Sequence, residues 1–342
     1  MTRGTARGAP NGGTEAVPSM RAIVQDTYGD TGVLRQERIA RPEPADDEVL
    51  VRVHAAGLDR GTWHLMTGKP YLMRIAGLGL RGPRERVLGR DLAGTVEAVG
   101  SAVTRFTAGE EVYGVGRGSF AEYAVAKQDK LARKPVNLSF EQAAVIAISA
   151  GTALQALTDH GRIEAGQKVL VIGASGGVGS YAVQLAKAFG AEVTGVAGTA
   201  KQDLVRSLGA DHVLDYTRDD YADGSHHYDL VLDIAGNPGL SRLRRALKPQ
   251  GTAVLVGGEH GGNLTGGMNR SLRALMLSPF VSQRLAWFIA QERASDLERL
   301  AEHFEAGRVT PSIGRTYPLD EVPEAIADLA SGQVRGKVAI TI

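Results

Sequence analysis

Short apolar runs, glycine turns and helical patterns alternate in the middle of the chain. An apolar run of strand length, 168–172, ends at Gly173. From Val178 the apolar residues recur every three or four positions until Gly190, which predicts a helix. A second apolar strand is expected at 191–197. Strand, glycine turn, helix and strand in this order predict the first unit of a parallel sheet.

The turn between that strand and helix has the composition of a phosphate-binding loop. Gly176 allows backbone to approach a pyrophosphate, and Gly179 allows the helix to pack closely on the strand. The unpaired N–H groups at the helix N-terminus attract an anion. The dinucleotide fingerprint is met imperfectly, because Ala174 stands at its first glycine position. The turn residues expected to contact a dinucleotide are Ala174, Ser175, Gly176, Gly177, Val178 and Gly179.

Three further strands continue this alternation. They are expected at 212–216, 228–236 and 252–258, with helices at 201–208 and 241–247 between them. This order predicts a doubly wound α/β sheet, in which ligands bind at the carboxyl ends of the strands. By that analogy, Ala235, Gly257 and Gly258 are expected to line the nicotinamide side of a dinucleotide.

The turn after the second strand bears on the choice of dinucleotide. A carboxylate about twenty residues after the glycines normally holds the adenosine ribose, but Gly198, Thr199 and Lys201 occupy this turn. A hydroxyl and an ammonium group suit a 2′-phosphate, and no carboxylate in the turn repels it. We therefore expect NADPH (NADP) rather than NADH. The alternative is that Lys201 is an ordinary solvated lysine at the start of a helix.

The chain before this unit has a different pattern, in which glycine and proline divide short β segments. Strands are expected at 21–25, 48–55, 93–99, 111–114 and 121–126. Few helical patterns interrupt them, so residues 20–143 predict a largely antiparallel, barrel-like module. Residues 1–19 are rich in small residues, arginine and proline without periodicity, and we expect a disordered arm.

Composition narrows the classes of function. At 342 residues the chain exceeds the size that one core usually supports, so two domains are expected. Its 39 basic and 38 acidic residues nearly balance, which argues against nucleic acid and anionic lipid as partners. The absence of cysteine excludes disulfides and thiolate metal sites, and suits a reducing, cytoplasmic location. No apolar run reaches the roughly 18 residues expected of a membrane span.

Eight segments together carry a resemblance to a known family. They read VLVRVHAAGLDRGTWHLMTG, VLGRDLAGTVEAVG, GEEVYGV, GSFAEYAVA, GTALQAL, GASGGVGSYAVQLAKAFGAEV, LGADHVLDY and GRVTPSIGRTYPLDEVPEAIADLASGQVRGKVAI. On these motifs, the chain from Met20 to Ile342 resembles the medium-chain dehydrogenase/reductase superfamily, in its zinc-free quinone oxidoreductase-like branch. The resemblance implies a GroES-like β-barrel catalytic domain formed by both chain ends and a Rossmann domain between them. The expected boundaries are 20–143, 144–292 and 293–342, the last completing the catalytic domain.

The chain departs from the zinc-dependent relatives at their metal sites. Those relatives bind catalytic zinc with cysteine and histidine, and they carry a four-cysteine structural site. This chain has no cysteine, and it has Gly89, Arg90 and Asp91 where they have glycine, histidine and glutamate. We therefore expect no metal site, and we interpret Arg90 and Asp91 as an internal ion pair or a support for a turn. The adjacent His226 and His227 lie in a polar loop and are expected to be solvated.

Three further expectations follow from the resemblance. Thr152, at the domain junction, is expected to contact the nicotinamide end, with a helix-surface hydroxyl bonded to backbone as the alternative. Tyr216 corresponds to a residue near the adenosine phosphate. The apolar stretch 272–290 corresponds to a region in which a strand of related enzymes pairs across a two-fold axis. This predicts a homodimer, with a buried edge strand as the alternative.

Candidate catalytic residues lie in the loop LDRGTWHLMTGKPY. The family usually has asparagine, near the nicotinamide and the substrate, where this chain has Asp59. His64 is a candidate proton donor because imidazole titrates near neutrality, and a structural hydrogen-bonding role is the alternative. Tyr71 is a candidate phenolic donor or a packed aromatic residue. The insertion that follows, residues 72–85, combines apolar side chains with arginines and is interpreted as a flap over the pocket or as a surface excursion.

These residues lead to one principal hypothesis and two alternatives. The principal one is an NADPH-dependent, zinc-independent oxidoreductase that reduces quinones or α,β-unsaturated carbonyl compounds by direct hydride transfer. Conjugated acceptors are favoured because they spread developing charge without a metal ion. The alternatives are an NAD(P)-dependent alcohol dehydrogenase and a non-catalytic NADPH-binding sensor or structural protein.

Overall fold

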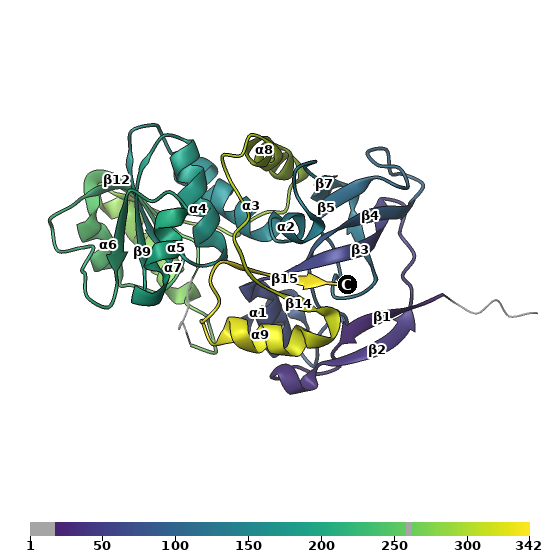
Figure 1. The fold of residues 1–342 in the computed structure, drawn as a ribbon. Coiled ribbons are helices and arrows are strands. Elements are labelled where there is room, and N and C mark those ends of the chain that lie inside the picture. Colours follow the sequence, from purple (N-terminus) through teal and green to yellow (C-terminus); the bar gives the residue numbers. More distant parts are fainter. Residues whose placement is uncertain (1–17, 258–261) are drawn as a thin grey trace, which may run out of the picture.

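The computed structural model describes residues 18–257 and 262–342, and they form a parallel sheet and a mostly antiparallel sheet side by side (Figure 1). Residues 1–17 of the expected arm and Gly258 lie outside the described residues. The last residue of the expected arm, Ser19, already belongs to strand β1 (Ser19–Val24). Ser19 is therefore part of a strand and not of a disordered arm.

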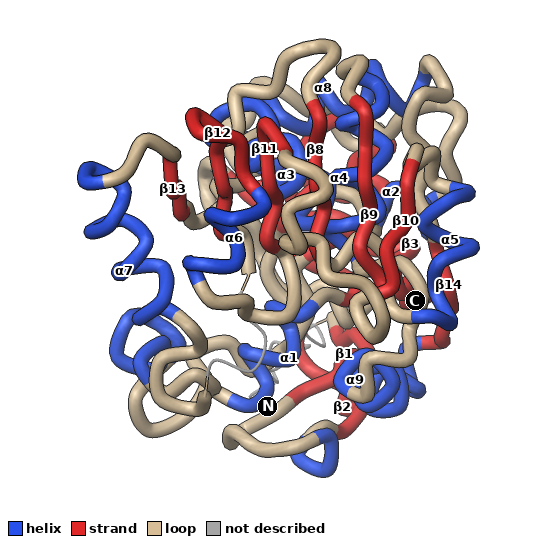
Figure 2. Tube along the Cα trace, turned by 90° about the vertical axis from the view of Figure 1, so that its left-hand side faces the viewer, coloured by secondary structure: helices blue, strands red, loops and turns tan. Residues whose placement is uncertain are grey.

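The parallel sheet has six strands in the order β10-β9-β8-β11-β12-β13 (Figure 2). Its strands are β8 (Lys168–Ile172), β9 (Glu192–Ala197), β10 (His212–Asp215), β11 (Tyr228–Asp233), β12 (Leu247–Leu255) and β13 (Arg284–Trp287). Its helical segments are α4 (Gly177–Ala188), η5 (Thr199–Lys201), α5 (Gln202–Ser207), α6 (Leu240–Ala246), α7 (Met268–Leu277) and η6 (Ser278–Phe280). The doubly wound α/β fold that the sequence predicted is confirmed.

The strand order reverses at β8, which pairs with β9 on one side and with β11 on the other. Such a switch point opens a crevice at the carboxyl ends of the strands, and it is the usual ligand position in this architecture. The glycine turn that follows β8 leads directly into α4, so it lies at this switch point. The fold therefore brings the predicted phosphate-binding turn to the predicted edge of the sheet.

Of the strands that the sequence predicted in this sheet, only β8 has its expected range, and β12 differs most from its range. β12 begins at Leu247, which was expected to end a helix, and it includes residues 248–251, which lie between that helix and the strand expected at 252–258. Its pairing with β11 shifts register, because Leu247 is opposite Tyr228 and Thr252 is opposite Leu230. The extra residues are therefore absorbed as a bulge, which hydrophobic spacing does not reveal. In the stretch 272–290, the strand is limited to the four residues of β13, and most of the remainder is helical.

The second sheet has seven strands in the order β14-β15-β3-β4-β5-β7, with β6 paired to β3. Its strands are β3 (Glu48–Leu58), β4 (Asp91–Val99), β5 (Glu111–Val115), β6 (Tyr123–Lys127), β7 (Leu131–Arg133), β14 (Ile313–Pro318) and β15 (Lys337–Thr341). All pairs except β14 with β15 are antiparallel. This sheet matches the predicted antiparallel, GroES-like module. A separate two-stranded sheet consists of β1 and β2 (Arg35–Ala40).

Helical segments complete this part of the chain. They are η1 (Thr31–Val33), α1 (Arg60–Thr67), η2 (Arg74–Leu78), η3 (Gln128–Lys130), α2 (Phe140–Ala144), α3 (Ala147–Gln155), η4 (Ala156–His160), α8 (Ala294–Glu305), η7 (Leu319–Glu321) and α9 (Val322–Ala330). The C-terminal β15 lies beside β3, so the end of the chain returns to the seven-stranded sheet that the N-terminal part of the chain began (Figure 1).

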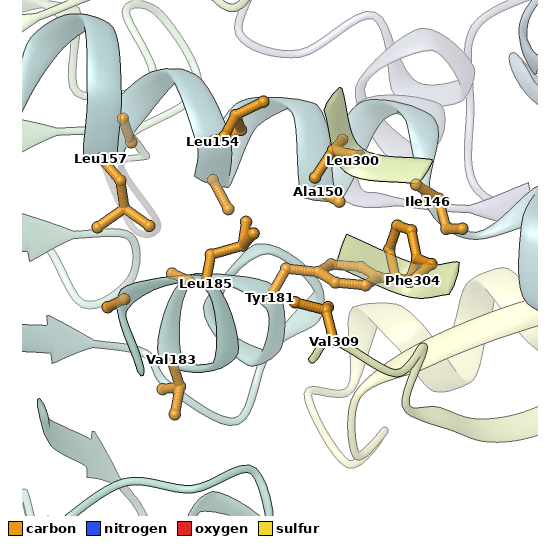
Figure 3. Close-up of a cluster of buried hydrophobic side chains, with 14 of the residues drawn as sticks. Ile146, Ala150, Leu154, Leu157, Tyr181, Val183, Leu185, Leu300, Phe304 and Val309 are labelled. Carbon is orange, nitrogen blue, oxygen red and sulfur yellow. The ribbon is translucent and has the colours of Figure 1, made fainter. Parts of the chain in front are cut away.

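The largest apolar cluster joins the two sheets through α3, α4 and α8 (Figure 3). Leu154 of α3 and Leu185 of α4 are fully or almost fully buried in it, each with an exposed fraction of at most 1%. The ring of Tyr181 meets that of Phe304 edge to face, with centroids 6.2 Å apart, and its hydroxyl donates to the carbonyl of Val145. Each such side chain contributes roughly 1.5–3 kcal/mol of burial free energy. This shared core holds α3 and the N-terminal end of α4 at the junction of the sheets.

Candidate active site

The turn between β8 and α4 leaves the N-terminus of α4 without a cap from any described side chain. Gly173 has a φ angle of 88°, in the region that favours glycine. A Cβ atom on Gly179 would lie 2.0 Å from the carbonyl oxygen of Gly173, so packing requires glycine there. A Cβ on Gly176 would meet the same oxygen at 3.4 Å, an ordinary contact. The uncapped N–H groups and the missing side chains fit a dinucleotide pyrophosphate.

Three other predicted turn residues are buried, pack against the apolar cluster or form a hydrogen bond with a neighbouring segment. Ala174 is fully buried, and Val178 packs against the large apolar cluster. Ser175 is 8% exposed, and its carbonyl accepts a hydrogen bond of 3.1 Å from the N–H of Gly336. The glycine turn is therefore attached to the segment just before β15.

A buried lysine lies beside this turn. Lys337, the first residue of β15, is 2% exposed, and its Nζ donates to Ser149 Oγ at 2.9 Å and to the Leu58 carbonyl at 3.2 Å. A Cβ placed on Gly177 would lie 3.0 Å from Lys337 Cδ and 3.9 Å from its Nζ. Both acceptors are neutral, so a buried positive charge lies next to the positive end of the α4 dipole. Such a place favours an anionic ligand.

Two carboxylates lie near this lysine, at the same end of the sheet. Asp91 begins β4 opposite Gly57 of β3, and Asp59 directly follows the end of β3, which pairs with β15. We call Asp59, Asp91, Lys337 and Ser149 the interdomain cluster. Among the described residues, the Oδ2 atoms of both aspartates are buried without a hydrogen-bond partner. Three neighbouring strands thus bring ionisable groups to one end of the second sheet.

Asp91 links the two sheets. Its Oδ1 accepts a 3.0 Å hydrogen bond from the N–H of Ile148 at the start of α3, where a helix needs an acceptor. Burial raises the pKa of Asp91 to about 8, although the charge of Lys337 acts to lower it. Arg90 instead pairs with Glu292 at 2.5 Å. The expected Arg90–Asp91 ion pair is therefore wrong, because Asp91 is fully buried at the start of β4 whereas Arg90, which precedes the strand, extends to Glu292 at the surface.

The predicted residues of the adenosine turn come together at the ends of β9 and β10. A Cβ on Gly198 would lie 3.3 Å from the ring of Tyr216, which is 65% exposed. Thr199 donates its hydroxyl hydrogen to Asp215 at the end of β10. The ammonium of Lys201 donates to the carbonyls of Gly332 and Val334, each at 2.7 Å.

Asp215 is a carboxylate close to this turn that the residues of the turn itself do not reveal. It lies one strand away from the turn and is 3% exposed. Hydrogen bonds from Thr199 and Thr217 lower the pKa of Asp215 to about 2. The turn itself lacks a carboxylate, as the sequence indicated, but the fold supplies one beside it.

On the predicted nicotinamide side, Ala235 packs against the glycine turn. A Cβ on Gly173 would lie 2.6 Å from the Cβ of Ala235. Arg270 of α7 binds the carboxylate of Asp233 and donates to the Gly257 carbonyl at 3.0 Å. The hydroxyl of Thr152 donates to the Ile148 carbonyl at 2.6 Å, which is the backbone-bonded arrangement given as the alternative. These contacts fix the loops after β11 and β12 to α7.

The three candidate catalytic residues occupy different positions along the loop. Asp59 caps α1, since its Oδ1 accepts from the N–H of Thr62 at 3.1 Å. His64 Nδ1 lies 2.6 Å from the carbonyl oxygen of Lys69, so this nitrogen carries the hydrogen. Tyr71 is 43% exposed, and the guanidinium of Arg74 lies 4.9 Å from its ring centroid. Only Asp59 belongs to the interdomain cluster.

The insertion 72–85 contains a short helical turn, η2, and it is held in place by hydrogen bonds to other parts of the chain. Tyr28 donates its hydroxyl to the carbonyls of Leu78 and Gly79, at 2.7 and 2.9 Å. Ile75 and Leu80 are 73% and 68% exposed. Backbone bonds from residues 71 and 72 reach the carbonyls of residues 263 and 264. The insertion therefore lies between α1 and the segment that leads into α7.

Three further features bear on function: groups that could hold a metal ion, a hollow at the surface, and helices that could cross a membrane. Residues 18–257 and 262–342 contain no group of three or more His, Asp or Glu side chains that could hold a metal ion. A hollow of about 420 Å³ is lined by Arg162, Asp229 and Lys248 at the amino ends of the parallel strands, opposite the glycine turn. None of the helices in these ranges has the length and apolar character that a membrane crossing requires.

Known proteins resemble this chain over nearly its whole length. Residues 45–136 match the family described as "Alcohol dehydrogenase GroES-like domain", and residues 208–340 match "Zinc-binding dehydrogenase". The chain is 32% identical to a quinone oxidoreductase of Sus scrofa, covering 91% of this chain and 94% of that protein. It is 33% identical to a chloroplastic NADPH-dependent alkenal/one oxidoreductase of Arabidopsis thaliana, covering 94% and 79%. The solved quinone oxidoreductase of Coxiella burnetii superposes with a TM-score of 0.83 at 28% identity, covering 95% and 100%.

The sequence did not single out Lys337, Ser149 or Asp215 as members of a site. Lys337 begins an apolar strand, and its charge in that position is the one local signal that was available. Ser149 lies in an apolar helix, and Asp215 ends a strand. These residues belong to the site only because the fold brings their strands and helix next to one another.

Proposed function

The chain belongs to the medium-chain dehydrogenase/reductase superfamily, in the quinone oxidoreductase-like branch, and on this basis we propose an NADPH-dependent, zinc-independent reductase of quinones or α,β-unsaturated carbonyl compounds. As a member of this family it is an oxidoreductase with a Rossmann-type dinucleotide-binding domain. The observation that carries the proposal is the uncapped α4 N-terminus with the buried Lys337 beside it. Both features favour an anion where the fold binds dinucleotides.

Each part of the site has a proposed task toward the cofactor. Gly176 and Gly179 leave room for the pyrophosphate, and Lys337 balances its charge. Ala235, Gly257 and Thr152 are proposed to line the nicotinamide end. When bound, the cofactor supplies a hydride. The chain's own residues bind the cofactor, orient it, and exclude water from the junction of the two sheets.

The preference for NADPH rests on the adenosine turn. Lys201 provides positive charge there, and Tyr216 offers an exposed hydroxyl close to Gly198. The Arabidopsis thaliana relative is named NADPH-dependent, which supports the same choice. We propose NADPH as the principal cofactor.

The proton that completes the reduction has three candidate sources in Asp59, His64 and Tyr71. His64 bonds the Lys69 carbonyl through Nδ1–H, so in the neutral ring Nε2 is an acceptor. His64 therefore donates a proton only in its imidazolium form. Tyr71 has an exposed phenol next to the insertion, and we propose it as a donor to a quinone oxygen. Asp59 is proposed to orient the substrate loop, since it caps α1.

A second candidate function is an NAD(P)-dependent alcohol dehydrogenase. It is favoured by the match of residues 208–340 to a family described as zinc-binding dehydrogenases. That chemistry needs a metal ion to stabilise an alkoxide, whereas the chain lacks cysteine and has Arg90 and Asp91 at the corresponding motif. We therefore rank it second.

The experiment follows NADPH and NADH oxidation in the presence of a chelator, with a benzoquinone, a 2-alkenal or a simple ketone as acceptor. We expect NADPH-dependent turnover of the quinone or the alkenal. Turnover of the ketone alone, or only after zinc is added, would contradict the proposal. Tight NADPH binding without turnover of any acceptor would instead favour the non-catalytic sensor.

We also propose that two copies of the chain associate through α7 and β13. β13 is the outer strand of the parallel sheet, and α7 exposes Leu272 and Met276 at 55% and 73%. Apolar side chains at this spacing on one helix face suit an interface. Sedimentation of wild type and of Met276→Glu tests this: a dimer is expected for wild type and a monomer for the variant. A monomeric wild type would contradict it.

A further inference from the structure

The buried carboxylate of Asp215 lies beside the turn that is proposed to bind the adenosine ribose. We propose that Asp215 is a specificity-determining residue. It accepts a hydrogen bond from the Thr199 hydroxyl, so this hydroxyl can only accept a hydrogen bond from a ligand, and the site can bind NADH as well as NADPH. This inference rests on the proposed function, because it concerns the same cofactor site. It assigns the strength of the NADPH preference to a residue outside the turn itself.

Both carboxylate oxygen atoms of Asp215 accept hydrogen bonds from neighbouring protein groups. Oδ1 accepts from the N–H and the hydroxyl of Thr217, at 3.0 and 2.7 Å. Oδ2 accepts from the hydroxyl of Thr199 and from Nε2 of Gln202, the latter at 3.1 Å. The N–H of Asp215 donates to Asp219 at 2.7 Å. The carboxylate is thus fixed in place, and donors on both sides keep it ionised.

This arrangement determines what Thr199 can offer to a ligand. A threonine hydroxyl has one hydrogen and two lone pairs, and in Thr199 the hydrogen is used by Asp215. Toward the ribose, Thr199 therefore presents acceptor sites only. A 2′-hydroxyl can donate to such a site, whereas a 2′-phosphate at neutral pH has mainly acceptor oxygens and gains nothing from it.

The charges around the turn act in opposite directions. The negative charge of Asp215 disfavours a 2′-phosphate next to Thr199. The ammonium of Lys201 favours it, but two of its hydrogens are directed to the carbonyls of Gly332 and Val334. The balance predicts modest selectivity, with wild-type dissociation constants for NADPH and NADH within about tenfold of each other.

The test is the variant Asp215→Asn, with dissociation constants for NADPH and NADH measured by calorimetry on the purified full chain. The asparagine keeps an oxygen for Thr217 and presents an amide to Thr199, which releases the threonine hydrogen toward the ligand. We expect NADPH to bind about tenfold more tightly and NADH to bind no more tightly, the size expected of one hydrogen bond to a charged group. An unchanged ratio of the two constants would overturn the inference.

Two further variants separate the hydrogen bond from bulk charge. Asp219→Asn removes a charge four residues away, and its amide oxygen can still accept from the N–H of Asp215. We expect it to change the ratio less than twofold. The same shift as in Asp215→Asn would overturn the role of Thr199. In the double variant Thr199→Val with Asp215→Asn, the gain should disappear.

The outcomes distinguish this inference from the proposed function. If the wild type binds neither nucleotide, the proposed function fails and the inference fails with it. If it binds and turns over NADPH but Asp215→Asn leaves the ratio unchanged, only the inference fails. Thermal unfolding of each variant without nucleotide confirms that the comparison is made on folded protein.

Discussion

The glycine turn before α4 and the interdomain cluster lie in contact, yet the chain builds them in different ways. The turn is one continuous segment, and steric fit determines its residues, as the 2.0 Å approach of a Cβ on Gly179 to Gly173 illustrates. The cluster collects Asp59, Asp91 and Lys337 from the ends of three strands. Its properties depend on burial and charge. The site therefore combines a glycine turn, which depends on steric fit within one segment, with a cluster that depends on the charges of residues distant in the sequence.

The difference has a measurable consequence. A steric requirement does not change with pH, whereas a buried carboxyl responds to it through its proton. Substitutions in the turn should act equally at all pH values, and substitutions in the cluster should not. Substitutions at Gly179, Lys337 and Asp91 test that distinction, and the change at Gly179 should have the largest effect.

Gly179→Ala should be the most damaging change. Its Cβ would lie 2.0 Å from a backbone oxygen, so the strand and helix must move apart. We expect destabilisation of about 1–3 kcal/mol or more and loss of detectable NADPH binding, measured by urea unfolding and calorimetry. Gly176→Ala is the matched control, since its Cβ meets the same oxygen at 3.4 Å. It should keep the stability and weaken only the binding; equal damage from both variants would contradict the steric account.

Lys337→Met should affect binding more than folding. Without the ammonium, the pyrophosphate loses its buried counter-charge, and we expect a dissociation constant for NADPH about ten- to a hundredfold higher. The apo protein should unfold within about 1 kcal/mol of wild type, because removing a buried charge offsets the lost bonds to Ser149 and Leu58. Lys127→Met, which removes an exposed partner of Asp47, is the control and should leave binding unchanged. Unaltered NADPH binding in Lys337→Met would remove this lysine from the site.

Asp91→Asn should alter the pH dependence of stability. The folded pKa of about 8 exceeds the unfolded value near 3.8, so the folded state holds a proton that the unfolded state releases between these values. Stability should therefore fall as pH rises from about 4 to about 8, and then level off. Asparagine keeps an acceptor for the N–H of Ile148 but has no proton to lose. We expect the stability of the variant relative to wild type to rise between pH 5 and pH 8.5 in urea unfolding, by up to about 1.4 kcal/mol per pH unit; parallel curves would contradict the raised pKa.

Sequence patterns sufficed for features that depend on neighbours along the chain. The β8 range was predicted to the residue, and the glycine turn, α4 and the alternation of strands and helices were confirmed. Features that depend on pairing between distant segments were not predictable in the same way. The partner of Arg90 is Glu292, the bulge in β12 depends on β11, and Asp215 reaches Thr199 from the adjacent strand. No periodicity in one sequence encodes such contacts, because they depend on strand order and register.

The smallest effect should come from the insertion 72–85, which belongs to neither the turn nor the cluster. Ile75 and Leu80 are mostly exposed, and the insertion is held instead by Tyr28 and Arg74. Replacing both exposed side chains with serine should change the free energy of unfolding by less than about 0.5 kcal/mol. If the insertion is a flap over an apolar acceptor, KM for the quinone should rise about three- to tenfold, at unchanged kcat and unchanged NADPH affinity. Val136→Ser, at a 90% exposed position before α2, is the control and should change none of these quantities. An unchanged KM in the double variant would identify the insertion as a surface excursion.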